Sequence, residues 1–340
     1  MVFDLITMGR VGIDLYPLRG GVGLAEVDSF ARYLGGSSTN VAVAAARYGR
    51  RVATITRTGA DPFGDFVHTA LRGYGVDDRW VSAVEGLPTP VTFCELFPPD
   101  DFPLYFYRYP QAPDLRISAE ELDQAAINAA KVFWVTGTGL SAEPSRSATL
   151  TALAGRAQAA STIPPDADQT TRPITVLDLD YRPMFWESRA AATEALRAAL
   201  PYATVVVGNL DEAETAVGTR DPRRAAELLL AAGAELAVVK QGPAGVLART
   251  ARTEVLVGPV EVTVVNGLGA GDAFGGALCH GLLAGWPLPR VLRFANAAGA
   301  LVAAELACSD AMPTAEQVFR LLAAANEDTG QAATPEVSGG

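Results

Sequence analysis

Apolar and polar positions form a regular succession of blocks along the second half of this chain. From about residue 132, short apolar runs alternate with longer segments of helical periodicity. Buried strands that alternate with helices are typical of a parallel sheet covered on both faces. We therefore predict strands at 132–136, 174–179, 203–207 and 236–240, and helices at 144–160, 186–200 and 221–232.

The N-terminal third begins with the same alternation. We predict strands at 2–8 and 51–57 and helices at 38–48 and 63–74. Each of these helices ends at or next to a glycine, which is a common residue at helix C-termini.

Between about residues 80 and 109 the residue composition changes, and aromatic and β-branched residues dominate. The segments 91–97 and 104–108 are predicted as antiparallel strands, separated by the proline-rich turn 98–103. The last third, 270–324, is predicted to be helical, and the small, polar residues 325–340 are predicted to form a flexible tail.

Composition narrows the classes of function. The length of 340 residues and the 49% of hydrophobic residues suit one large α/β domain. The net charge of −11 argues against binding of a nucleic-acid backbone. The three cysteines are widely spaced and form no metal-ligand pattern. No basic and apolar leader opens the chain, and no uninterrupted apolar run reaches ~18 residues. We expect a cytoplasmic protein that neither crosses nor binds a membrane.

The segment Asn266–Phe274 carries the strongest chemical signal. Three glycines lie within five residues, next to Asp272, and a helix-like run follows. Such a loop can aim backbone N–H groups at a phosphate, and a neighbouring carboxylate can accept a proton from an attacking hydroxyl. A glycine-rich turn in which Asp272 only caps the helix is the structural alternative.

Further polar groups follow the predicted strands. They are Asp14 and the segments 35–40, 178–182, 209–212 and 240–245. Taken singly, each can be a cap, a turn or a solvated loop. Because ligands of an open parallel sheet gather at the carboxyl ends of its strands, their shared position indicates one binding rim.

Neither a Walker-type loop nor a Rossmann fingerprint after the first strand is present. The chain instead resembles the ribokinase-like (PfkB) carbohydrate kinases over about residues 2–320. The resemblance rests on Gly35-Gly-Ser-Ser-Thr-Asn40 with the downstream 59–64, on Gly269-Ala-Gly-Asp-Ala-Phe274, and on Asn209-Leu-Asp-Glu212.

This resemblance implies a ribokinase-like α/β fold. Its core is a three-layer α/β/α arrangement with a mainly parallel sheet, and a small β-sheet forms a lid. The kinase domain would span 1–324, with lid strands approximately within 10–35 and 80–115. A homodimer formed through the lid is a further expectation.

The resemblance also implies roles for individual residues. Asp272 matches the catalytic base, and the amides of Gly269, Ala270 and Gly271 match the anion hole for the transferred phosphoryl group. The positions that match sugar contacts are Asp14, Gly35, Gly36 and Asn40. The positions that match the nucleotide side are Asn209, Lys240, Gly242, Gly245 and Asn296. Glu212 would organise the metal, through water.

The implied reactants and cofactors are a small sugar, ATP and Mg²⁺. The family signature often begins with Asp-Thr, whereas this chain has Asn266-Gly267. That aspartate often helps to bind a monovalent cation. Because it is absent here, the resemblance does not imply that potassium activates this protein.

Four segments narrow the choice of sugar substrate, because they are similar to the 5-dehydro-2-deoxygluconate kinases of inositol breakdown. These segments are 9–17, 98–108, 137–146 and 178–186. Arginine is the natural bidentate partner of a sugar-acid carboxylate, and Arg108 and Arg182 are the candidates. A 2-keto-3-deoxygluconate kinase is the nearest alternative and a fructokinase a weaker one. A sugar- or nucleotide-binding protein without turnover is the alternative from another class.

Overall fold

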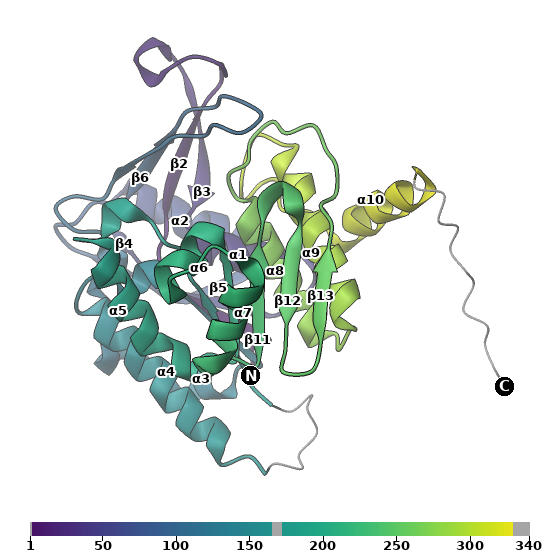
Figure 1. Cartoon of the computed structure of the whole chain (residues 1–340). Coiled ribbons are helices and arrows are strands. Elements are labelled where there is room, and N and C mark those ends of the chain that lie inside the picture. The colour runs from purple at the N-terminus through teal and green to yellow at the C-terminus, as the bar shows by residue number, and fades with distance from the viewer. Residues whose placement is uncertain (1, 165–171, 329–340) are drawn as a thin grey trace.

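The computed structural model describes residues 2–164 and 172–328, whose strands form two sheets (Figure 1). The large sheet contains β1 Leu5–Met8, β4 Val52–Gly59, β5 Val76–Val84, β8 Val132–Thr136, β9 Ile174–Asp178, β10 Val205–Asn209, β11 Leu236–Lys240, β12 Val246–Arg249 and β13 Glu254–Val257. Its order is β13-β12-β11-β10-β9-β8-β1-β4-β5. Neighbours from β11 to β5 pair in parallel, whereas β12 and β13 pair antiparallel at one edge.

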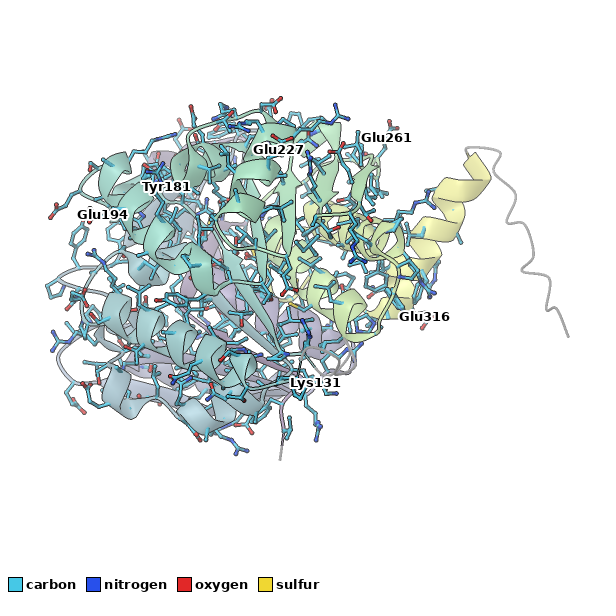
Figure 2. All side chains as sticks on the ribbon, turned by 60° about the horizontal axis from the view of Figure 1, so that its bottom comes forward. Lys131, Tyr181, Glu194, Glu227, Glu261 and Glu316 are labelled. Carbon is cyan, nitrogen blue, oxygen red and sulfur yellow. The ribbon has the colours of Figure 1, made fainter. Side chains whose placement is uncertain are left out.

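Helices cover both faces of this sheet. One face carries α1 Ser37–Arg47, α2 Pro62–Gly73, α8 Ala270–Leu283, α9 Leu288–Ala303 and α10 Ala315–Asp328. The other face carries α3 Gln124–Ala129, α4 Ser145–Ser161, α5 Arg189–Ala199, α6 Leu210–Val217 and α7 Pro222–Ala231. Charged side chains such as Lys131, Glu194 and Glu316 lie on the periphery (Figure 2).

The strands divide their side chains between two cores. Leu5, Trp134 and Val205 belong to the core under α1 and α8, and their neighbours Ile6 and Phe133 belong to the core under α4 and α5. This alternation is the period of two that a strand imposes on its side chains. The predicted three-layer α/β/α architecture with a mainly parallel sheet is therefore confirmed.

The second sheet, which we call the lid, contains β2 Gly12–Pro17, β3 Phe30–Gly35, β6 Val91–Cys94 and β7 Leu104–Tyr107. Its order is β3-β2-β6-β7, and β6 and β7 pair antiparallel as predicted. Buried Tyr16 and Cys94 of the lid pack with Ala307 and Cys308 of the main body. The Tyr16 hydroxyl lies 2.6 Å from the Cys308 sulfur, which fixes the base of the lid to the segment before α10.

Several boundaries differ from the sequence-based prediction. The helix predicted at 186–200 begins at Arg189, because the Ser188 side chain accepts a hydrogen bond from the Ala191 N–H and caps it there. β5, β12 and β13 were not predicted. The predicted tail began at 325, but α10 continues to Asp328, and residues 329–340 lie outside the described part of the chain.

A helix that spans a membrane needs about 20 mostly apolar residues. Among residues 2–164 and 172–328, no helix is both long and apolar enough to cross a bilayer.

Gly276 lets α8 lie directly against α1, and this contact gives a stability prediction. A Cβ atom at Gly276 would overlap the Ala44 side chain and lie 3.0 Å from the Val41 carbonyl oxygen. Gly276→Ala should therefore lower the free energy of unfolding by about 1–3 kcal/mol, as overpacking does.

Urea unfolding measures this change, with Gly73→Ala as the matched control. Gly73 ends α2 and has open space around it. The control should shift the free energy of unfolding by less than about 1 kcal/mol. Equal effects of the two substitutions would show that the close α1–α8 approach does not constrain position 276.

Candidate active site

The residues predicted at the binding rim gather between the carboxyl ends of the parallel strands, the starts of α1 and α8, and the lid. A small cavity of about 50 Å³ lies there, lined by Arg10, Asp14, Gly36, Asn40, Arg182 and Asp272 among others. Leu104 and Phe106 of β7 close it from the lid side. Residues as far apart in the sequence as Arg10 and Asp272 thus form one polar site.

Asp272 lies in the first turn of α8 and is held in a fixed orientation. The Asn40 side-chain amide donates to Asp272 Oδ2 at 2.8 Å, and Ser309 Oγ donates to the Asn40 carbonyl at 2.6 Å. Burial raises the pKa of Asp272 to about 6, although the hydrogen bond from Asn40 lowers it. Asp272 is thus a carboxylate at neutral pH that can accept a proton.

The glycine loop turns the chain into α8. Gly269 has a φ of +81°, and a side chain there would overlap Cys308. The first N–H groups of a helix have no partner within the helix, so those of Ala270 and Gly271 are available to an anion. A Cβ atom at Gly271 would lie 3.2 Å from Lys240 Nζ, which places that ammonium beside the amides.

Lys240 at the end of β11 belongs to a group of buried charges. Burial would lower its pKa, but the carboxylates of Glu212, Asp178 and Asp272 outweigh this effect and raise it. Burial raises the pKa of Asp178 well above its usual range, against the attraction of Lys240. Lys240 therefore keeps its positive charge beside the glycine loop.

A second hollow of about 390 Å³ lies on the other side of the glycine loop. It is lined by Lys240, Gly242, Gly245, Ala270, Gly271 and Asn296, together with apolar residues such as Val260 and Phe274. Gly245 has a φ of +85°, and a side chain there would overlap the Val257 carbonyl. The predicted nucleotide-side glycines, Lys240 and Asn296 thus share one hollow, which meets the small cavity at the glycine loop.

Asn209 and Glu212 form a reciprocal cap on α6. The Asn209 side chain accepts hydrogen bonds from the amides of Asp211 and Glu212, and Glu212 Oε2 accepts one from the Asn209 amide at 2.7 Å. Glu212 is 4% exposed and lies close enough to raise the pKa of Lys240. The motif therefore has a structural role, and its carboxylate also faces the charge cluster.

Mg²⁺ often binds to proteins through one or two carboxylates, with water and phosphate oxygens completing its shell. Within residues 2–164 and 172–328, no group of three His, Cys, Asp or Glu side chains is placed to hold a metal. A single carboxylate such as Glu212, acting through water, fits that pattern.

The remaining predicted sugar contacts also meet at the small cavity. Gly35 packs directly on the Asp14 carboxylate, where a Cβ atom would overlap it, and Gly36 has a φ of +102°. Burial raises the pKa of Asp14 to about 7, with Arg10 opposing the shift. Arg182 lines the cavity as well.

Arg108, the other predicted sugar contact, does not line the small cavity. Its guanidinium donates to both carboxylate oxygens of buried Asp114, at 2.7 and 3.0 Å, and lies 4.9 Å from the Phe185 ring. Arg108 lines a separate surface groove and not the small cavity. The structure therefore does not place Arg108 where the sequence-based prediction required it.

The cavity contains a different arginine, Arg10, to which the sequence analysis assigned no role. Arg10 is the second residue after β1 and belongs to the segment 9–17, so its place after a strand end was the available signal. Its side chain, 11% exposed, pairs with Asp180, a buried aspartate that also pairs with Arg182.

Comparisons with known proteins show the family to which the chain belongs. The family model described as pfkB family carbohydrate kinase matches residues 2–315. The 5-dehydro-2-deoxygluconokinase of Shouchella clausii is 32% identical over 324 residues, covering 94% of this chain and 95% of that protein. That of Clostridium tetani is 31% identical over 335 residues, covering 96% and 95%.

Solved structures show the same fold. A fructokinase of Xylella fastidiosa with bound ATP has a TM-score of 0.78 and 25% identity, over 97% of this chain and 100% of that one. A candidate ribokinase II of E. coli, in complex with ATP and Mg²⁺, has a TM-score of 0.82 and 21% identity, over 95% and 100%. The predicted ribokinase-like fold is confirmed.

The Asn40–Asp272 hydrogen bond gives a prediction about titration. Because Asn40 stabilises the charged form, Asn40→Ala should raise the pKa of Asp272 above its value of about 6. Carbon-13 NMR of the aspartate carboxylates measures this shift, and the signal that Asp272→Asn removes identifies Asp272.

Asn296→Ala is the matched control, since this amide donates to the Gly258 carbonyl in the second hollow. It should leave the titration of Asp272 unchanged. A pKa that stays the same or falls in Asn40→Ala would contradict the orienting role of Asn40.

Proposed function

The chain belongs to the pfkB family of carbohydrate kinases, and we propose that it transfers the γ-phosphoryl group of ATP to the primary hydroxyl of 5-dehydro-2-deoxy-D-gluconate, a step of inositol breakdown. The observation that carries the proposal is that Asp272, Arg10 and Arg182 line the same small cavity. Relatives that are 31–32% identical over nearly the whole chain carry the name of this activity.

Asp272 is the proposed general base. The sugar hydroxyl attacks phosphorus, the bond from phosphorus to the ADP oxygen breaks, and the hydroxyl proton passes to Asp272 Oδ2 or Oδ1. Asn40 fixes the carboxylate for this transfer. With a pKa of about 6, Asp272 is mostly ionised at neutral pH yet remains a useful proton acceptor.

The amides of Gly269, Ala270 and Gly271 are the proposed anion hole. They begin α8, where unpaired N–H groups and the helix dipole favour negative charge. Lys240 beside Gly271 adds a full positive charge at the same place. Together these groups stabilise the charge on the phosphoryl oxygens during transfer, which is the main demand of this chemistry.

The second hollow is the proposed nucleotide site. Gly242 and Gly245 permit close approach of phosphates, and the apolar wall with Asn296 suits an adenine ring. The Xylella and E. coli structures, solved with ATP, support this use of the fold. Bound Mg²⁺ would neutralise phosphate oxygens, with Asn209 and Glu212 as its proposed organisers through water.

Two sugar alternatives remain to be compared in an assay. A 2-keto-3-deoxygluconate carries the same type of carboxylate and would suit the same arginines. Fructose carries no carboxylate and would offer the two arginines no anionic partner beyond Asp180.

A binding protein without turnover is not favoured, because the matched family and the relatives are kinases. Cytoplasmic location and dimerisation through the lid stay predictions.

A substrate panel tests the proposal, with ADP release as the readout. The protein should phosphorylate 5-dehydro-2-deoxygluconate with a higher kcat/KM than 2-keto-3-deoxygluconate or fructose. Asp272→Asn should keep the fold and lower kcat by ~10²–10⁴, the usual loss when a positioned acid–base group is removed.

Circular dichroism of Asp272→Asn provides the control for folding. Turnover of fructose above that of both sugar acids would overturn the proposed substrate. Near-full turnover by Asp272→Asn would instead overturn the assignment of the base.

Glu212→Gln should raise the magnesium concentration needed for half-maximal rate. The substitution removes the negative charge, whereas a glutamine at this position retains the helix-capping hydrogen bond. The melting temperature should therefore change little while the magnesium titration shifts.

Asp211→Asn is the control, because this carboxylate lies in the same turn but is paired with Arg189 and Arg220. Its magnesium titration should match that of the wild type. An unchanged titration in Glu212→Gln would remove Glu212 from the metal site.

A further inference from the structure

A buried carboxylate, Asp180, lies between two arginines of the small cavity. We propose that Asp180 is a positioning residue that holds Arg10 and Arg182 as one paired guanidinium site for the substrate's carboxylate, and that Arg10 determines the preference for sugar acids. This inference rests on the proposed function, since it assigns the residues that bind the carboxylate of the substrate.

Asp180 is itself fixed from several directions. Ser37 Oγ at the start of α1 and Thr138 Oγ1 after β8 both donate to Asp180 Oδ2, at 2.7 and 2.9 Å. The side chain is 2% exposed, and its backbone has a φ of +30°. Non-glycine residues rarely adopt such a φ, and they do so where surrounding structure enforces it. The carboxylate is therefore a fixed point at the end of β9.

Both arginines are attached to this fixed point. Arg10 donates through Nε to Oδ2 at 3.3 Å and through Nη2 to Oδ1 at 3.5 Å, while Arg182 Nη2 lies 3.3 Å from Oδ1. Burial alone would raise the pKa of Asp180, but Arg10 and Arg182 outweigh it and lower the pKa to about 2. Asp180 thus stays ionised and keeps both guanidinium groups in place at all physiological pH values.

Each arginine retains donors that Asp180 does not use. Arg182 Nε is buried and has no hydrogen-bond partner among residues 2–164 and 172–328. Arg10 binds Asp180 through Nε and Nη2, so its Nη1 is not used in this pair. A buried donor without a partner is costly, and both side chains line the cavity. A carboxylate in the cavity would supply the missing acceptors.

The lid covers this pair of arginines. Phe106 of β7 packs edge-on against Phe185 at 4.9 Å, and Arg10 Cζ lies 5.9 Å from the Phe106 ring. Exclusion of water by these rings strengthens the attraction between a guanidinium and an anion. The same rings separate the cavity from Arg108, whose charge is matched by Asp114. Arg10 and Arg182 are therefore better placed than Arg108 to read a carboxylate.

The test compares kcat/KM for 5-dehydro-2-deoxygluconate with kcat/KM for its uncharged C1 amide. In Arg10→Gln this acid-to-amide ratio should fall about 10- to 100-fold, the scale of a lost charge-assisted hydrogen bond. The loss should appear in KM for the acid, while KM for ATP stays unchanged. Asp180→Asn should lower the ratio about 3- to 10-fold, because the arginines remain but lose their anchor.

Two further variants keep the test decisive. If Asp180→Asn fails to fold, Thr138→Val removes one hydrogen bond to Asp180 and should lower the ratio in the same direction. Asp114→Asn removes the other buried aspartate of an Asp–Arg pair and should leave the ratio unchanged, because that pair lies outside the cavity. A ratio that falls in Asp114→Asn but not in Arg10→Gln would overturn the proposal and show that Arg108 binds the substrate's carboxylate.

The wild-type ratio separates failure of this inference from failure of the proposed function. A wild-type enzyme without preference for the acid over the amide would overturn the acid-sugar assignment itself. A wild-type enzyme that prefers the acid, with equal losses on acid and amide in Arg10→Gln, would leave that assignment standing. It would show that Arg10 and Asp180 only stabilise the cavity.

Discussion

The close contact between α1 and α8 is the constraint on which the site depends. Gly275 packs against Trp134 and Val41, and Gly276 packs against Ala44, so α8 contributes no side chain at these two positions of the contact. This distance lets Asn40 of α1 reach Asp272 of α8. A wider separation would leave the carboxylate without its orienting amide and would move the glycine loop away from both hollows. Small residues in the core thus set the geometry of the polar groups above it.

Buried and partly buried charges of both signs balance one another around that contact. Arg10 and Arg182 surround Asp180, and Lys240 lies near Asp178 and Glu212. Buried charges are tolerated only where opposite charges and hydrogen bonds compensate their desolvation. Here the compensation divides the site into two halves, an arginine half under the lid and a lysine half beside the glycine loop, with Asp272 between them.

The lid links this electrostatic arrangement to the rest of the fold. Its base is fixed by Tyr16 of the inner strand β2 and by Cys308, while Phe106 of the edge strand β7 lies near Arg10. The lid therefore shields Arg10 from water and leaves the larger hollow on the other side of the glycine loop accessible. Such an arrangement suits a reaction that must keep water from the transferred group.

The sequence by itself determined the alternation of strands and helices, the glycine loop before α8 and the polar residues at the strand ends. Hydrophobic periodicity and glycine are local signals, so these features can be recognised without tertiary information. Edge strand β5 was missed because Asp77, Asp78 and Arg79 interrupt its apolar pattern, as exposure at a sheet edge permits. Only the tertiary structure decided which arginine enters the cavity. Arg10 meets Asp180 across 170 positions, whereas Arg108 finds Asp114 six residues away, and no local pattern distinguishes these two outcomes.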